Sequence, residues 1–72
     1  MNLYIFEDVL FDYTGGMVAI AADSVEGALE IAREKYGDHC LEHEEGWRKP
    51  TGVYAVGTGV EAGIRHECWG GS

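Results

Sequence analysis

The stretch Asp23–Gly37, DSVEGALEIAREKYG, decides the fold, because it is the one segment with a clear helical period. Its apolar residues recur at the i, i+3, i+4, i+7 spacing of a buried stripe. The stripe consists of Val25, Ala28, Leu29, Ala32 and Tyr36, widened by Ile31. Either Asp23 or Ser24 can cap the start of this helix, and Gly37 is well placed to end it.

The segment before the helix predicts two strands. Residues 2–11, NLYIFEDVLF, are rich in aromatic and branched side chains. Alternation places one apolar set on one face and another apolar set on the other: Leu3, Ile5, Val9 and Phe11 against Tyr4, Phe6 and Leu10. Such a strand is expected to be central in a sheet or covered on both sides. Residues 12–16 predict a turn, and Met17–Ala22 predicts the returning strand of a hairpin.

The segment after the helix predicts a loop and two more strands. Residues 38–52 show no clean period and indicate a long loop, with a helical turn near Leu41. Residues 53–56 predict a short strand, residues 57–59 a tight hairpin turn, and residues 60–69 the last strand. Its expected buried face consists of Val60, Ala62, Ile64, His66 and Cys68.

The predicted order is therefore ββαββ. It corresponds to an α+β fold with a four-stranded, mainly antiparallel sheet and one helix packed across one face. The 72 residues suffice for a single domain with a thin core, with residues 70–72 as a frayed tail.

Charge is the unusual property of this chain. Thirteen Asp and Glu face five Lys and Arg, a formal net charge of -8, and residues 1–32 contain no Lys or Arg. Such a surface repels nucleic acid and anionic membranes and attracts basic surfaces; the alternative is that acidity serves only solubility. The first residues lack the basic region of a signal peptide, and no apolar run approaches membrane-spanning length. We expect a cytosolic protein with reduced cysteines.

The sequence contains one pattern that is typical of nucleotide binding. Residues 57–62, GTGVEA, match G-x-G-x-x-G/A, whose mechanism requires a helix to follow the glycines. Here a strand is predicted to follow, so a hairpin turn explains the glycines better.

Four thiol and imidazole side chains raise the possibility of zinc. Cys40 and His43 form a C-x2-H pair, and His66 and Cys68 form an H-x-C pair. These side chains are zinc ligands by type, although H-x-C is not a usual spacing. The alternative is core packing for the cysteines and surface positions for the histidines, and we expect no cofactor.

Catalytic signatures are weak in this sequence. A cysteine nucleophile with a histidine base would also need a pocket and an orienting third group. The chain has only two serines, Ser24 and Ser72, and neither lies in a nucleophile motif. We expect a protein that is not an enzyme.

Acidic residues form the remaining constellation. Glu26, Glu30 and Glu34 repeat at i+4 and line one helix ridge at intervals of about 6 Å. Further acids lie along the first strand and at the helix start: Glu7, Asp8, Asp12 and Asp23. Together they could form one band of carboxylates, although a solvated helix face is the simpler interpretation. We expect Tyr13, Trp47 and Trp69 to be exposed, with Trp47 as an aromatic anchor for a partner; the alternative is that they cover the small core.

The chain resembles a group of very small acidic phage proteins in size, charge and predicted element order. The resemblance runs through residues 4–37, residues 53–63 and the terminal WGG of residues 69–71. Several such proteins are anti-CRISPR inhibitors, and those most similar in character occupy the basic DNA channel of a type I surveillance complex (Cascade) as DNA mimics. The resemblance brings no catalytic residue and no single diagnostic motif. Arg48, Lys49 and Arg65 depart from an all-acidic surface and should lie away from the target.

The leading functional hypothesis is a phage-encoded anti-CRISPR inhibitor in the host cytoplasm. Its carboxylates would block target-DNA binding by pairing with the basic residues of a host nucleic-acid-binding complex, Cascade by resemblance. The inhibitor would touch neither nucleic acid nor membrane and would be a monomer or weak dimer. Two alternatives stay open: a structural or dimerisation module that pairs through an open sheet edge, and a small zinc-stapled adaptor.

Overall fold

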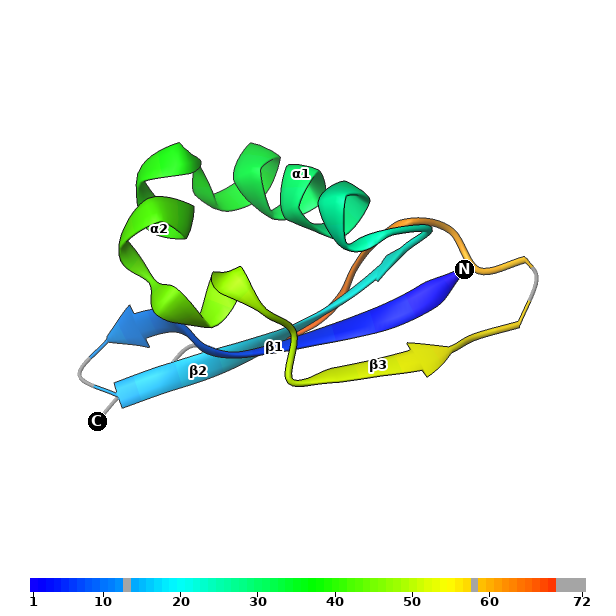
Figure 1. The fold of residues 1–72 in the computed structure, drawn as a ribbon, viewed down its shortest axis with the longest axis horizontal. Coiled ribbons are helices and arrows are strands. Elements are labelled where there is room, and N and C mark those ends of the chain that lie inside the picture. The colour runs from blue at the N-terminus through cyan, green and yellow to red at the C-terminus, as the bar shows by residue number, and fades with distance from the viewer. Residues whose placement is uncertain (13, 58, 69–72) are drawn as a thin grey trace.

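Strand β1 (Asn2–Asp12) is one of the two inner strands of the sheet, as its two apolar faces predict (Figure 1). The computed structural model describes residues 1–12, 14–57 and 59–68, with the side chains of residues 11, 12 and 14 outside that description. The elements that follow β1 are β2 (Thr14–Ala22), α1 (Val25–Tyr36), α2 (Asp38–His43), the 3-10 helix η1 (Glu45–Arg48), β3 (Gly52–Ala55) and β4 (Gly63–Cys68). The sheet order is β3-β1-β2-β4 with antiparallel neighbours, which confirms the α+β, ββαββ prediction.

The core lies on one face of the sheet, between the strands and α1, α2 and η1 (Figure 1). Cross-strand partners Tyr4–Ile20 and Phe6–Val18 face these helices and are buried. On α1, Ala28 and Ala32 are fully buried. Val25, Leu29, Ile31 and Tyr36 pack beside the core. The predicted helical stripe is therefore the packing face of α1.

Both ends of α1 are set by local chemistry. Ser24 is the N-cap, and its hydroxyl oxygen accepts a hydrogen bond of 3.1 Å from the Gly27 amide. Gly37 ends the helix with a φ of 93°, a conformation that glycine adopts easily, and its amide donates to the Arg33 carbonyl at 2.8 Å. Of the two predicted caps, Ser24 rather than Asp23 does the capping, and the predicted stop at Gly37 is confirmed.

The far half of β1 departs from simple alternation. The pairing with β2 shifts register between Glu7 and Val9 and again between Val9 and Asp12, and Asp8 and Leu10 have positive φ values of 59° and 53°. Bulges of this kind place neighbouring side chains on one face. Val9 and Leu10 are consequently both fully buried in the same core, so the prediction that they lie on opposite faces is wrong.

The hairpin between β1 and β2 is tighter than predicted. Thr14, Gly15 and Gly16 belong to β2 rather than to a five-residue turn. Tyr13 lies outside the described residues, so its predicted exposure is not tested.

Residues 38–52 are not the predicted loop. They form α2 and η1 before the chain enters β3, so the helical turn expected near Leu41 belongs to a larger helical connection. Two elements of six and four residues are too short to show a hydrophobic period in the sequence. The side chain of Trp47 holds η1 against Phe6 of β1, with ring centroids 5.2 Å apart.

The last two strands do not form a hairpin, although the glycines of residues 57–59 predicted one. β3 and β4 lie at opposite edges of the sheet, so their connection crosses from one edge to the other. β4 is also shorter than predicted and begins at Gly63. A register shift between the partners of Ala19 and Ile20 leaves Arg65 as an extra residue. His66 and Cys68, predicted to be buried, are therefore exposed on the face away from the helices.

Gly46 tests the contact between η1 and the bulged part of β1. A Cβ added at Gly46 would lie 1.9 Å from the Glu7 carbonyl oxygen and 2.6 Å from that of Asp8. We expect Gly46→Ala to lower the free energy of unfolding by about 1–3 kcal/mol, measured by chemical denaturation. Gly57→Ala, where a Cβ meets nothing within 4 Å, is the matched control and should change it by less than about 0.5 kcal/mol. Equal stability of the two variants would contradict the close approach.

Candidate functional site

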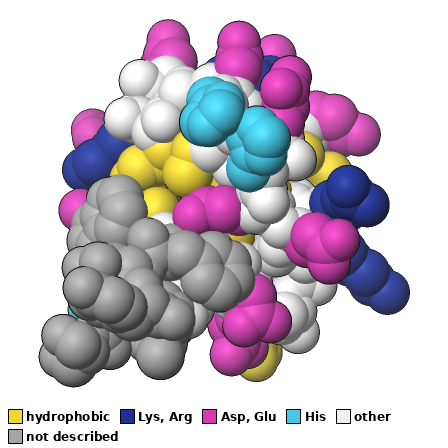
Figure 2. Space-filling view, turned by 90° about the vertical axis from the view of Figure 1, so that its left-hand side faces the viewer, with side chains coloured by type: hydrophobic (Ala, Val, Ile, Leu, Met, Phe, Trp, Pro, Cys, Tyr) yellow, Lys and Arg dark blue, Asp and Glu magenta, His cyan; other side chains and the backbone are white. Residues whose placement is uncertain are grey.

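The outer side of α1 carries three exposed carboxylates, Glu26, Glu30 and Glu34, which we call the glutamate ridge. Their i, i+4 spacing places them one turn apart on one helix face. Figure 2 shows carboxylates along the upper rim of the molecule, on the side of the helices. Glu30 and Glu34, together with Arg33, also border a groove of about 660 Å³ that reaches Ala62, the residue before β4.

The two cations of α1 pair with carboxylates outside the ridge. Arg33 Nε lies 2.5 Å from a carboxylate oxygen of Asp38, and Lys35 Nζ lies 3.5 Å from one of Glu67. Tyr36 also donates a hydrogen bond to Glu67, which together with Lys35 holds the pKa of that carboxyl below its usual range. Within the described part of the chain, no ion pair includes a ridge glutamate. The ridge therefore keeps its negative charge exposed to solvent.

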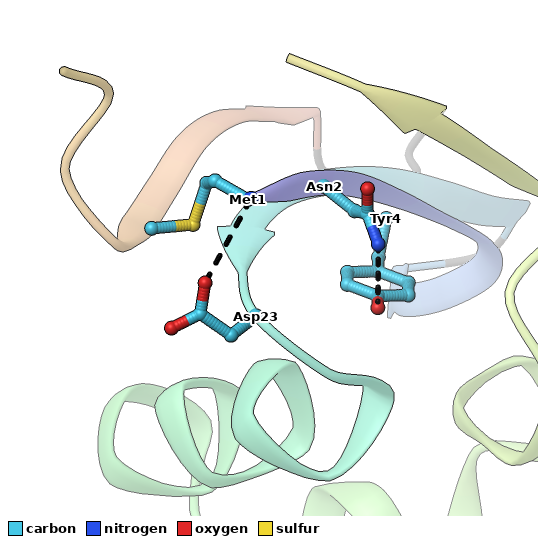
Figure 3. A network of polar contacts seen from close by, with 4 residues as sticks. All are labelled: Met1, Asn2, Tyr4 and Asp23. Carbon is cyan, nitrogen blue, oxygen red and sulfur yellow. Dashed lines mark hydrogen bonds and ion pairs between the residues drawn. The ribbon is translucent and has the colours of Figure 1, made fainter. Parts of the chain in front are cut away.

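Asp23 lies beside the N-terminus of the chain. Its carboxylate oxygen is 3.8 Å from the Met1 amino group, and its side chain is largely exposed. Figure 3 marks this contact with a dashed line. In the same view Asn2 donates to the Tyr4 hydroxyl at 3.3 Å. Asp23 precedes the first turn of α1, so it extends the ridge at one end with a partly offset charge.

Glu7 and Asp8 belong to a second surface region. Both are exposed at the bulge of β1 and border a hollow of about 480 Å³ beside η1, together with Glu45 and Lys49. Glu7 accepts a hydrogen bond of 2.9 Å from the Thr51 hydroxyl. This hollow and the groove beside α1 share no lining residue. The predicted band is thus two acidic regions, and the Asp12 side chain lies outside the described residues.

Trp47 is a core residue and not an exposed anchor. Only 2% of its surface is exposed, and its ring packs at 5.2 Å from Phe6 and 5.7 Å from Tyr36, measured between ring centroids. Trp47 is the largest side chain of a thin core, and it fills the space beneath the short helices. The prediction of an exposed partner-binding tryptophan at this position is wrong, and Trp69 lies outside the described residues.

Glu44 is the acidic residue whose role the sequence did not reveal. Its Oε1 atom accepts hydrogen bonds from the Leu10 amide at 3.0 Å, the Trp47 indole at 2.8 Å and the Cys40 thiol at 2.9 Å. These donors come from β1, η1 and α2. In the sequence, the only indication of this role is that a glutamate stands three residues before a tryptophan. Glu44 therefore joins β1, α2 and η1 through one carboxylate oxygen.

The four side chains considered as an alternative zinc set are not assembled in one place. Cys40 and His43 lie on α2, on the helical side of the sheet, whereas His66 and Cys68 lie on its opposite face. Within the described ranges, no group of three or more His, Cys, Asp or Glu side chains is arranged to hold a metal ion. The bulge at Arg65 and the position of α2 separate the two pairs.

The Cys40 thiol is less acidic than an ordinary cysteine thiol. Burial, together with the hydrogen bond to the nearby Glu44 carboxylate, raises the pKa of the Cys40 thiol to about 11. A nucleophilic cysteine requires a lowered pKa. The geometry around Cys40 therefore gives no support to cysteine catalysis.

No family model, curated protein or solved structure matches this chain. Among the described residues, none of the helices has the length and apolar character needed to cross a bilayer.

Removing the Glu44 carboxylate should destabilise the fold. In Glu44→Ala the buried Trp47 indole and Leu10 amide lose their acceptor, and we expect the free energy of unfolding to fall by about 1–3 kcal/mol. Glu45→Ala, an exposed neighbour with the same change in charge, should shift it by less than about 0.5 kcal/mol. Chemical denaturation of both variants distinguishes a structural carboxylate from a general effect of charge.

The two thiols should differ in reactivity. At neutral pH we expect Cys40, measured in Cys68→Ser, to react with a thiol reagent on the order of a hundredfold more slowly than Cys68, measured in Cys40→Ser. The physical reason is the small thiolate fraction of Cys40. Comparable rates would show that the Cys40 thiol is neither shielded nor raised in pKa.

Proposed function

We propose that this chain is a non-enzymatic binding protein whose glutamate ridge docks on a basic surface that otherwise holds nucleic-acid phosphates. The observation that carries the proposal is the exposed, evenly spaced set Glu26, Glu30 and Glu34, whose neighbouring cations are paired with other carboxylates. A ridge without its own counter-ions is available to cations of a partner.

The physical basis is electrostatic complementarity. A chain with a formal net charge of -8 is steered toward a positive patch, and this increases the association rate more than it increases intrinsic affinity. Ridge carboxylates spaced at about 6 Å are more widely separated than the charges of duplex DNA, which average one per about 1.7 Å of axis. Mimicry of a duplex therefore needs neighbouring acids, and Asp23 is the predicted acid closest to the ridge in sequence.

Each acidic region has a base at its border, and the pairing of these bases favours the ridge over the second region. Arg33 borders the groove beside Glu30 and Glu34, but its guanidinium is paired with Asp38. Lys49 borders the hollow that contains Glu7 and Asp8, where it would oppose binding to a cationic partner. Arg65 donates a hydrogen bond to the Glu61 carbonyl. We assign the main contact to the ridge with Asp23, and a peripheral one to Glu7 and Asp8.

The resemblance to small acidic phage proteins supports a concrete form of the proposal. In that form the chain is an anti-CRISPR protein that acts in the host cytoplasm, occupies the basic DNA channel of a type I surveillance complex and prevents target-DNA loading.

Reversing the charge of the ridge tests the proposal. Glu26→Lys, Glu30→Lys and Glu34→Lys in one variant should leave the fold intact, since all three side chains are exposed, but abolish binding to the purified surveillance complex and restore its DNA binding. The matched control combines Glu42→Lys, Glu61→Lys, Gly57→Lys and His66→Lys, four exposed positions that line neither acidic region and give the same change in net charge.

The control variant should retain inhibition, reduced only because its net charge is less negative. Inhibition by the ridge variant at the wild-type level would show that the ridge is not the interface, and equal loss in both variants would show that only net charge matters. A pull-down from a CRISPR-bearing host lysate should recover the partner at low salt and lose it at high salt.

A further inference from the structure

We propose that strand β3 pairs with β3 of a second copy of this chain, around a two-fold axis at Tyr54, to form a continuous eight-stranded sheet. The edge β3, residues Gly52–Ala55, lies at one border of the sheet with no described element beyond it (Figure 1). Its side chains Val53 and Tyr54 are 51% and 61% exposed, the large apolar side chains most open to solvent in the described chain.

The backbone of β3 is free to pair on its outer side. The Val56 amide donates to the Met1 carbonyl at 3.2 Å, and bonded positions alternate along an antiparallel ladder. With the register of β3 against β1, this makes Tyr54 a bonded position and directs the amides and carbonyls of Val53 and Ala55 away from β1. Those groups form the template that an added strand would use.

The distribution of charge along the chain favours this edge as the contact and a second copy as the partner. Residues 50–60 are the longest run in the chain without Asp, Glu, Lys, Arg or His. The other edge, β4, contains Arg65, His66 and Glu67, the kind of charged side chains that usually protect an edge. Two copies that each carry a formal charge of -8 repel least through an uncharged segment, and a strand antiparallel to itself supplies both halves of the contact.

The position of α1 keeps the glutamate ridges of two paired copies apart. α1 packs over β2 and β4, on the half of the sheet away from β3. Pairing at β3 therefore leaves the glutamate ridges of the two copies on the outer parts of the joined sheet, where their mutual repulsion is weak.

The register follows from which groups are already bonded. The Thr51 amide donates to the Ile5 carbonyl at 2.7 Å, so a register centred on Val53, which would need Thr51, is disfavoured. Centring on Tyr54 pairs Val53 of one copy with Ala55 of the other, and the reverse. The two Tyr54 side chains then lie directly opposite each other, on the sheet face without helices.

Sedimentation of the purified chain at concentrations up to about 1 mM tests the proposal. We expect a reversible dimer that persists or strengthens in high salt, because salt screens the repulsion between acidic copies. Tyr54→Glu places like charges opposite each other and should weaken dimerisation at least about tenfold. Ala62→Glu, an exposed position away from β3 with the same added charge, should change it less than about twofold.

Cross-linking tests the register independently of the stability of Tyr54→Glu. In a Cys40→Ser, Cys68→Ser background, Tyr54→Cys should form an intermolecular disulfide under mild oxidation, since facing Cβ atoms at such a position lie within bonding reach. Ala62→Cys in the same background should remain largely uncross-linked. A monomer at every concentration, a dimer that Tyr54→Glu leaves intact, or equal cross-linking at both positions would each overturn the proposal.

Discussion

The carboxylate of Glu44 is the interaction on which the architecture of the helical side depends. It accepts the Leu10 amide, whose residue has a positive φ of 53° that costs a branched, bulky side chain about 1–2 kcal/mol. The same oxygen accepts the Trp47 indole and the Cys40 thiol. Full burial of Leu10 and the hydrogen bond together offset the strained backbone, and Gly46 packs closely against the adjacent carbonyls of Glu7 and Asp8.

The sequence predicts those parts of the fold that follow from local pattern. The period of residues 23–37 predicts the helix and its buried face, and Gly37 predicts its end because few other residues adopt positive φ without strain. The two apolar faces of residues 2–11 predict a central strand. The bulge was not predictable, because the residues that pack against Asp8 and Leu10, which have positive φ, are Gly46 of η1 and Glu44, and these lie more than thirty residues later.

The candidate site shows the same division. Exposure of Glu26, Glu30 and Glu34 follows from the helical period, since the opposite face is buried. The separation of Glu7 and Asp8 from that ridge, and the burial of Trp47, depend on α2 and η1, which are too short to leave a period. The sequence also did not predict that the chain crosses from β3 to β4 and leaves β3 as a sheet edge. The glycines of residues 57–59 fit a tight hairpin turn as well as they fit a longer connection.

The crossing between β3 and β4 has a consequence for the order in which the fold is completed. Residues 1–48 contain the hairpin and the three described helical segments, whereas β3 and β4 come from one later segment and cover opposite borders of the hairpin. During synthesis the first part of the chain would emerge with both borders of the hairpin bare. The final twenty-odd residues supply the strands that cover both borders of the hairpin. Until those strands have paired, each border is open to strands of another molecule.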